Sequence, residues 1–208
     1  MLKVIGVTGK AGSGKSTVCR ILEERGGTLV DADKISRDIT QKGLPVFDEI
    51  IKYFGKEVLD ESGEIDRKRL GEIVFSSKAK LLVLNDITHR YIQQRIQETI
   101  LLLNVPKAKG FIVVDAAIPL EEGFRDVSDV VWTITSDDES RILRLIKRDG
   151  IPREIAENII ESQKKYDKLY DLSDVVIYND GDMEKLRAKI KKALDKAGVV
   201  YEKSSRQK

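Results

Sequence analysis

The sequence predicts a three-layer α/β/α protein with a parallel sheet, a helical insertion and a lid. Three observations carry this prediction. A complete phosphate-loop motif occupies residues 9–16, directly after an apolar run. Further short β-rich runs alternate with helical patterns, which is typical of a doubly wound parallel sheet. Residues 35–105 show helical periodicity and no convincing strand, which indicates an insertion into the core.

The first strand is expected at Lys3–Thr8 and leads into Gly-Lys-Ala-Gly-Ser-Gly-Lys-Ser. Every fixed position of G-x-x-x-x-G-K-[ST] is filled, and an amphipathic helical run follows from Thr17 to Arg25. Such a loop points N–H groups at phosphate oxygens, while Lys15 reaches the β/γ-phosphates and Ser16 binds Mg²⁺. These features define a P-loop nucleoside triphosphate site rather than a simple glycine-rich turn. The predicted ATP-binding residues here are Ala11, Gly12, Ser13, Gly14, Lys15, Ser16 and Thr17.

The second strand is expected at Thr28–Asp33 and ends in Asp31-Ala32-Asp33. Alternate residues of a strand share a face, so both carboxylates could point the same way. In a right-handed crossover this strand ends at the same sheet edge as the loop. A carboxylate there could take the proton of an attacking hydroxyl, or position Mg²⁺ through water. We expect Asp33 to do so, with Asp31 as the second candidate; alternatively, one of them caps the following helix.

Three further strands are expected at Gly110–Asp115, Val130–Thr135 and Val175–Asn179. Ligands of doubly wound sheets bind beyond the carboxyl ends of the strands, where Asp115 and Asn179 stand. Asp115 closes four hydrophobic residues and resembles the aspartate of a Walker B strand, although this pattern is common. The strand ends and the loop are therefore expected to share one edge of the sheet.

The insertion, residues 35–107, is interpreted as a helical acceptor-binding subdomain. Its expected helices are Val46–Phe54, Asp66–Phe75 and Lys78–Leu103. His89, the single histidine, and Arg90 are candidate contacts to an anionic acceptor. The alternatives are that these helices simply cover the sheet and that the histidine is structural.

Residues 137–168 are interpreted as a lid. Arg141, Arg144 and Arg148 recur at i, i+3 and i+7 of one predicted helix, and Gly150-Ile151-Pro152 ends it. Arginines after a sheet strand can close over transferring phosphates and stabilise the developing charge. For an arbitrary helix, a solvated arginine face would be the simpler interpretation. The remaining segments, residues 1–34, 108–136 and 169–208, form the expected nucleotide-binding core.

The composition excludes several classes of protein. The formal net charge is +2 and aromatic residues make up 6%, which argues against a nucleic-acid-binding groove. No run is long enough for a membrane span, and no signal peptide is visible before the first strand. Cys19, the single cysteine, excludes an internal disulfide and is expected to pack in the core. We expect a cytoplasmic protein without nucleic-acid or membrane partners, a monomer or weak homo-oligomer; a guanine-nucleotide switch would need Asn-Lys-x-Asp, which does not occur.

Several separated blocks together resemble the dephospho-CoA kinase family. They follow the family's order and spacing over roughly residues 3–195. The blocks are Gly6–Thr17, Asp31-Ala32-Asp33 with Ile35, Ser36 and Arg37, His89 with Ile92-Gln93-Gln94, Arg144 with Lys147-Arg148-Asp149-Gly150, and Asp174–Ile177 with Asn179 and Gly181.

The resemblance implies that ATP, with Mg²⁺, phosphorylates the 3′-hydroxyl of the ribose of dephospho-CoA, giving CoA and ADP in the last step of CoA synthesis. It implies Asp33 as general base, Lys15 and Arg144 as stabilisers of the transferring group, and Ser16 as a Mg²⁺ ligand. Arg148 and Asn179 would bind ATP, whereas Asp31, His89 and Arg90 would bind the acceptor. Another small-molecule or nucleotide kinase of the same architecture is the alternative.

The chain also departs from this family. Lys10 and Ala11 stand where the family has glycine and isoleucine, and Arg90 stands where a proline usually follows the histidine. The segment after the third strand, residues 115–121, has one leucine after its proline instead of two. These differences affect the expected acceptor contacts and leave the fixed positions of the phosphate loop unchanged.

Overall fold

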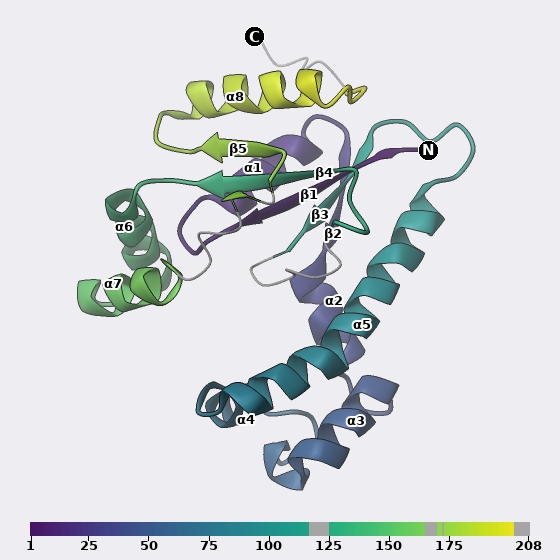
Figure 1. Cartoon of the computed structure of the whole chain (residues 1–208), viewed down its shortest axis with the longest axis vertical. Helices are drawn as coiled ribbons and strands as arrows, with labels where there is room; N and C mark the ends of the chain where they lie inside the picture. The colour runs from purple at the N-terminus through teal and green to yellow at the C-terminus, as the bar shows by residue number, and fades with distance from the viewer. Residues whose placement is uncertain (117–124, 165–169, 172, 202–208) are drawn as a thin grey trace. The chain divides into compact units, whose positions relative to one another are not determined.

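The computed structural model describes residues 1–116, 125–164, 170–171 and 173–201 (Figure 1). The chain divides into two compact units, residues 1–30 with 100–208, and residues 31–99. Within the described residues, the strands of the larger unit form one sheet in the order β2-β3-β1-β4-β5. The strands are β1 (Lys3–Gly9), β2 (Gly27–Asp31), β3 (Phe111–Asp115), β4 (Val130–Thr135) and β5 (Val175–Tyr178).

The sheet has the parallel topology that the alternating pattern predicts. β1 pairs in parallel with both β3 and β4, and β4 pairs in parallel with β5. Since β1 and β3 are next to each other in space but far apart in sequence, the chain crosses over between them. The predicted α/β class is therefore confirmed.

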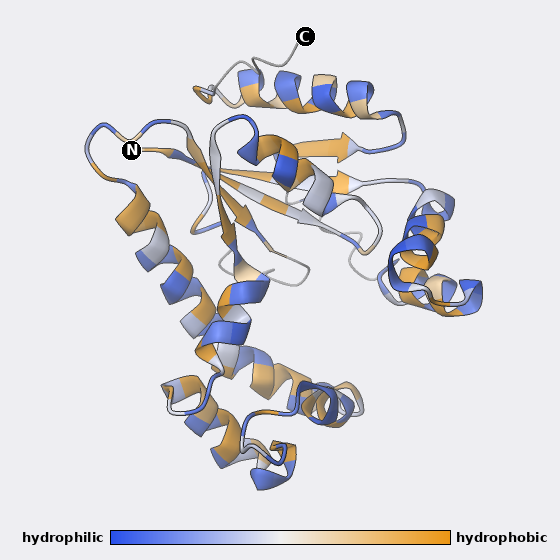
Figure 2. Ribbon diagram, turned by 180° about the vertical axis from the view of Figure 1, so that it is seen from behind, coloured by the Kyte–Doolittle hydropathy of each residue, from blue (hydrophilic) through white to orange (hydrophobic). Residues whose placement is uncertain are grey.

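The sheet is buried on both faces, as continuous apolar strands require. Ile5 and Val7 of β1 pack in one cluster with helices α1 (Lys15–Glu23) and α8 (Met183–Lys196). Figure 2 shows the apolar side of α8 turned toward the strands and its polar side turned outward. On the other face Ile112 is also fully buried. Parallel strands thus hold the loop that follows β1 on a rigid base.

Helices α6 (Asp138–Asp149) and α7 (Arg153–Ser162) form a hairpin with its own apolar cluster. Gly150 adopts a left-handed conformation after α6 and Pro152 precedes α7, so the predicted break between two helices is confirmed. Ala11 of the phosphate loop packs against this cluster. The hairpin is therefore in direct contact with the loop.

The smaller unit is helical. Its members pack around a cluster that includes Ile50, Phe54 and Leu70. The predicted helices here are found with small shifts; Asp66, for example, is the N-cap of α4 and not its first residue. The elements are α2 (Ala32–Ile39), α3 (Pro45–Phe54), the 3₁₀ turn Lys56–Val58, α4 (Arg67–Phe75) and α5 (Lys78–Leu103), whose last residues belong to the larger unit.

The second strand is shorter than predicted. It ends at Asp31, and Asp33 lies in the first turn of α2. The side chain of Asp31 accepts a hydrogen bond from the N–H of Lys34 at 2.9 Å, which ends the strand and begins the helix. The argument from strand alternation for Asp31 and Asp33 was therefore wrong, and the capping alternative is correct for Asp31.

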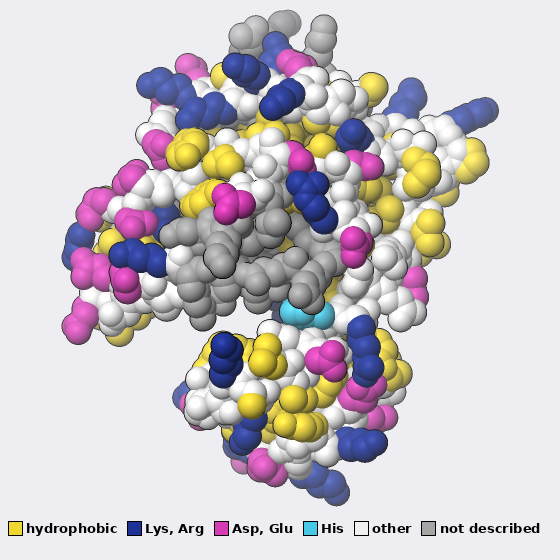
Figure 3. All heavy atoms as spheres, viewed as in Figure 1, with side chains coloured by type: hydrophobic (Ala, Val, Ile, Leu, Met, Phe, Trp, Pro, Cys, Tyr) yellow, Lys and Arg dark blue, Asp and Glu magenta, His cyan; other side chains and the backbone are white. Residues whose placement is uncertain are grey.

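Among the described residues of the face drawn in Figure 3, charged side chains of both signs are interspersed. Among the helices of the described segments, none combines the length and apolar character needed to cross a membrane.

Candidate functional site

The phosphate loop connects the buried end of β1 to the first turn of α1. Gly12 and Gly14 have φ angles of 75° and 90°, a region that glycine enters without strain. The turn they make lets α1 begin at Lys15. Because the first N–H groups of a helix have no acceptor within it, those of Lys15 and Ser16 are available to an anion at this end.

The carbonyl groups of the loop are held by donors from the opposite side. Arg144 donates to the oxygen of Gly12 at 3.1 Å, and the side-chain amide of Asn179 donates to that of Ser13 at 2.9 Å. Arg144 also donates to the backbone oxygen of Asn179 at 2.7 Å. Arg141 binds the oxygen of Ala11 at 3.0 Å. These contacts turn the carbonyl dipoles toward α6 and the end of β5, so they do not oppose an anion on the other side.

Lys15 and Asp115 form an ion pair between the loop and the end of β3. Both side chains are about one-seventh exposed, at 14% and 15%. The nearby residue Cys19 is 2% exposed, which confirms the expected core position. Burial, and then the negative charge of Asp115, raise the pKa of Cys19, so its thiol is neutral. Because Lys15 pairs with Asp115, the positive charge that the motif assigns to phosphate is balanced by a carboxylate in this structure.

The three arginines of α6 have different surroundings. Arg141 is 4% exposed and Arg144 is half-buried, and both bind the loop. Arg148, by contrast, is exposed and pairs with Asp149, at 2.7 Å. The structure thus brings two of the three onto the phosphate loop, and the solvated-face interpretation holds only for the last.

The remaining predicted residues lie in the smaller unit, apart from Ser16 and Thr17 in the first turn of α1. Asp33 is exposed on α2, and Asp31 is bound to its helix. His89 is half-buried on α5. Arg90 pairs with Glu49 of α3 and stacks on the ring of Tyr91, 5.0 Å from its centre. Arg90 therefore has a structural partner within its own unit.

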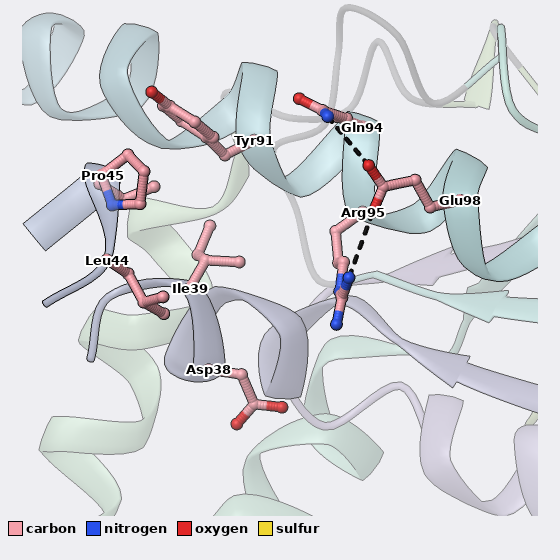
Figure 4. Close-up of a pocket in the computed structure, with 9 residues that line it drawn as sticks. Asp38, Ile39, Leu44, Pro45, Tyr91, Gln94, Arg95 and Glu98 are labelled. Carbon is pink, nitrogen blue, oxygen red and sulfur yellow. Dashed lines mark hydrogen bonds and ion pairs between the residues drawn. The ribbon is translucent and has the colours of Figure 1, made fainter. Parts of the chain in front are cut away.

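A pocket of about 300 Å³ opens within the smaller unit (Figure 4). Its wall combines apolar side chains of α2 and the start of α3 with polar side chains of α5. Glu98 accepts hydrogen bonds from Gln94 at 2.9 Å and Arg95 at 3.2 Å. These two contacts lower the pKa of Glu98, so it is ionised at neutral pH. The lining residues are Asp38, Ile39, Leu44, Pro45, Val46, Tyr91, Gln94, Arg95 and Glu98.

Sequence reasoning missed two groups of residues. Gln163 accepts a hydrogen bond from the N–H of Ala11 at 2.9 Å, yet no local pattern marks it. The pocket residues were missed because they are spread over three helices. Helical periodicity in the segment after residue 90 could have placed Tyr91, Gln94 and Glu98 on one side of α5.

The sheet, the glycine loop and the basic residues around it define a P-loop nucleotide-binding protein. The family model for dephospho-CoA kinase matches residues 3–185. The dephospho-CoA kinase of Carboxydothermus hydrogenoformans is 40% identical over 94% of this chain and 95% of its own. That of Fusobacterium nucleatum is 41% identical over 92% and 96%. The solved dephospho-CoA kinase of Campylobacter jejuni superposes with a TM-score of 0.67 at 26% identity, covering 94% of this chain and 97% of its own.

The chain belongs to the dephospho-CoA kinase family. This confirms the resemblance inferred from the separated sequence blocks.

Proposed function

We propose that this chain transfers the γ-phosphoryl group of ATP to the 3′-hydroxyl of the ribose of dephospho-CoA, giving CoA and ADP. The observation that carries the proposal is the complete phosphate loop with its carbonyls bound from behind by Arg144 and Asn179. Membership of the dephospho-CoA kinase family supports the choice of acceptor. Another small-molecule kinase of this architecture would share the loop but not the acceptor.

Lys15 is proposed to bind the β/γ-phosphates. To do so its ammonium group exchanges Asp115 for phosphate oxygens, which carry more negative charge. Arg144 adds a second cation behind the loop, where it favours the charge that grows on the transferring group. Asn179 and Arg148 are proposed to border the nucleotide.

Asp33 is proposed as the general base that accepts the proton of the attacking hydroxyl. It is exposed on α2, which leaves its oxygens accessible to a substrate. Asp31, His89 and Arg90 are proposed acceptor contacts; of these, Asp31 and Arg90 also have the structural bonds described above. The pocket of the smaller unit, with its apolar wall and ionised rim, suits an acceptor that is partly aliphatic and partly amide.

Mg²⁺ is proposed to accompany ATP. The described residues contain no group of three or more His, Cys, Asp or Glu that could hold a metal alone. This fits an ion that is bound mainly by substrate phosphates and water, with one or two protein oxygens. Ser16 is the proposed protein ligand, with Asp33 through a water. When bound, Mg²⁺ would neutralise charge on the phosphates.

The identity of the product tests this proposal. The enzyme is incubated with Mg²⁺, ATP and dephospho-CoA, and the new phosphate is located by ³¹P NMR and by comparison with authentic CoA. A 3′-phosphate on the ribose is expected. A phosphate on any other oxygen, or unchanged dephospho-CoA, would overturn the assignment.

A further inference from the structure

Two side chains, those of Arg141 and Gln163, bind the backbone of Ala11. The expected reaction assigns no role to either of them. Ala11 is one of the positions at which the loop departs from its family. Both its backbone N–H and its backbone carbonyl are bonded to side chains of the hairpin region. Its N–H donates to the side-chain oxygen of Gln163 at 2.9 Å, and its carbonyl accepts from Nε of Arg141 at 3.0 Å. The Ala11 side chain packs against the apolar cluster of α6 and α7. The loop is thus joined to the helical hairpin by this one residue in three ways.

Arg141 and Gln163 also bind each other. A guanidinium nitrogen of Arg141 donates to Gln163 at 3.2 Å, and another donates to Asp138 at 2.8 Å. The Arg141 side chain is 4% exposed, so these bonds take the place of bonds to water. The planar fork of arginine places its donors in fixed, diverging directions, which suits three acceptors that lie apart from one another. A buried cation that is bonded through all three of its nitrogen atoms holds its neighbours in one arrangement.

Some N–H groups of the phosphate loop are already bonded within the protein. The N–H of Ala11 is committed to Gln163, and that of Ser13 is bound to the carbonyl of Lys10 at 3.1 Å. Among the N–H groups of the loop, those of Ala11 and Ser13 are therefore already bonded within the protein and are not available to an anion. If Ala11 were free to rotate, its carbonyl dipole could turn toward the phosphates and repel them.

We propose that Arg141 and Gln163 are positioning residues for ATP, which hold the Ala11 peptide and thereby preorganise the phosphate loop. The inference deepens the proposed function, because it concerns the nucleotide half of the same site. It also links ATP affinity to α7, since Gln163 caps the end of that helix. Neither residue is expected to touch the acceptor.

Gln163 offers a matched pair of variants, because its side chain is only half-buried and its loss leaves the core unchanged. Gln163→Met keeps the length of the side chain but removes the acceptor, whereas Gln163→Glu keeps two acceptor oxygens opposite Arg141. Arg141→Lys retains the charge without the fork. Arg153→Gln is the control: on the surface, Arg153 joins α7 to α6 through Glu139 and also pairs with Glu157 of its own helix.

The test measures the dissociation constant of Mg²⁺-ATP by calorimetry without acceptor, then the KM values for both substrates. Gln163→Met and Arg141→Lys should weaken ATP binding about three- to tenfold and leave the KM for dephospho-CoA unchanged. Gln163→Glu and Arg153→Gln should stay within about twofold of the parent. Unchanged ATP affinity in Gln163→Met, or an equal loss in Arg153→Gln, would overturn the proposal.

The direct binding measurement separates this inference from the proposed function. A parent enzyme that binds ATP but leaves dephospho-CoA unmodified would refute the proposed reaction alone. A purely structural role would lower the thermal midpoint and the active fraction of Gln163→Met without changing its affinity for ATP. If Arg141→Lys does not fold, the Gln163 pair still decides the question.

Discussion

Lys15 of the phosphate loop is ion-paired with Asp115, the last residue of β3. The parallel pairing of β1 and β3 brings the ends of these strands to one edge of the sheet, which explains the contact. The pair limits the conformations of the Lys15 side chain. In the proposed reaction, phosphate oxygens of ATP replace this carboxylate as the partner of Lys15.

Replacing Lys15 by alanine should reduce phosphoryl transfer by at least about 100-fold, because the charge that faces the β/γ-phosphates is lost. Steady-state ADP release measures the effect. Lys192→Ala, an exposed lysine of α8, is the matched control and should retain parent activity. If Lys15→Ala keeps most of its activity, the loop does not bind ATP as proposed.

The change Asp33→Asn should lower kcat by about 10²- to 10⁴-fold, since a general base acts in the transition state. The dissociation constant of ATP should change less than about twofold, because Asp33 is assigned to the acceptor hydroxyl. Single-turnover kinetics and calorimetry measure the two quantities. A parallel loss of ATP affinity would show that Asp33 binds nucleotide instead.

For Asp31 we expect an effect on stability. Asp31→Ala removes the cap of α2 and should lower the free energy of unfolding by about 1 kcal/mol. Asp31→Ser restores a capping oxygen and should recover most of this loss in urea denaturation. A large loss of kcat in Asp31→Ser, together with a normal kcat in Asp33→Asn, would reverse the roles of the two aspartates.

Gly14→Ala should disable the loop. A Cβ at Gly14 would lie 2.1 Å from the side-chain nitrogen of Asn179, and the φ of +90° disfavours any other residue. The added methyl group would displace the amide that binds the Ser13 carbonyl. ATP affinity should fall about tenfold, which is the upper end of what one lost hydrogen bond between neutral groups contributes.

The control for this variant is Gly198→Ala. Gly198 also has a positive φ, of +65°, but a Cβ there meets nothing within 4 Å. It should therefore lose about 1 kcal/mol of stability through backbone strain alone and keep its ATP affinity. Equal ATP affinities for the two alanine variants would contradict the account of Gly14.

The Cys19 thiol should react with DTNB only when the protein unfolds. It is buried, and its pKa is raised, chiefly by burial and then by Asp115. A group with a raised pKa stays neutral as the pH rises through its ordinary value, so increasing the pH from 7 to 9 should leave the reaction slow. The absorbance of released thionitrobenzoate measures the rate. A fast reaction of the native protein at pH 9 would mean that α1 opens readily.

The sequence predicted those features that depend on local patterns. The loop, the parallel sheet and the long helix Lys78–Leu103 follow from a motif and from periodicity, and the helix bounds were correct. The predicted end of the second strand was wrong because the capping bond of Asp31 ends the strand at that residue. Residue propensities do not decide between a longer strand and an earlier helix.

Long-range contacts could not be predicted in this way. Gln163 accepts a hydrogen bond from Ala11, which is 152 positions away in the sequence, and Lys15 pairs with Asp115, which is 100 positions away. No sequence pattern predicts a long-range hydrogen bond of a glutamine. The position of Asp115 at the end of an apolar strand, by contrast, indicates a residue at the site. Arg141 was recognised as part of an arginine stripe, but its burial came from the packing of α6 on the loop.

In the proposed reaction, ATP phosphorylates dephospho-CoA. Its most direct test is ADP release by the purified enzyme with Mg²⁺-ATP and a panel of acceptors. The panel contains dephospho-CoA, nucleoside monophosphates and other small hydroxyl compounds. ADP release should rise strongly with dephospho-CoA and stay at the background level with nucleoside monophosphates. Release that rises with a nucleoside monophosphate and not with dephospho-CoA would contradict the account.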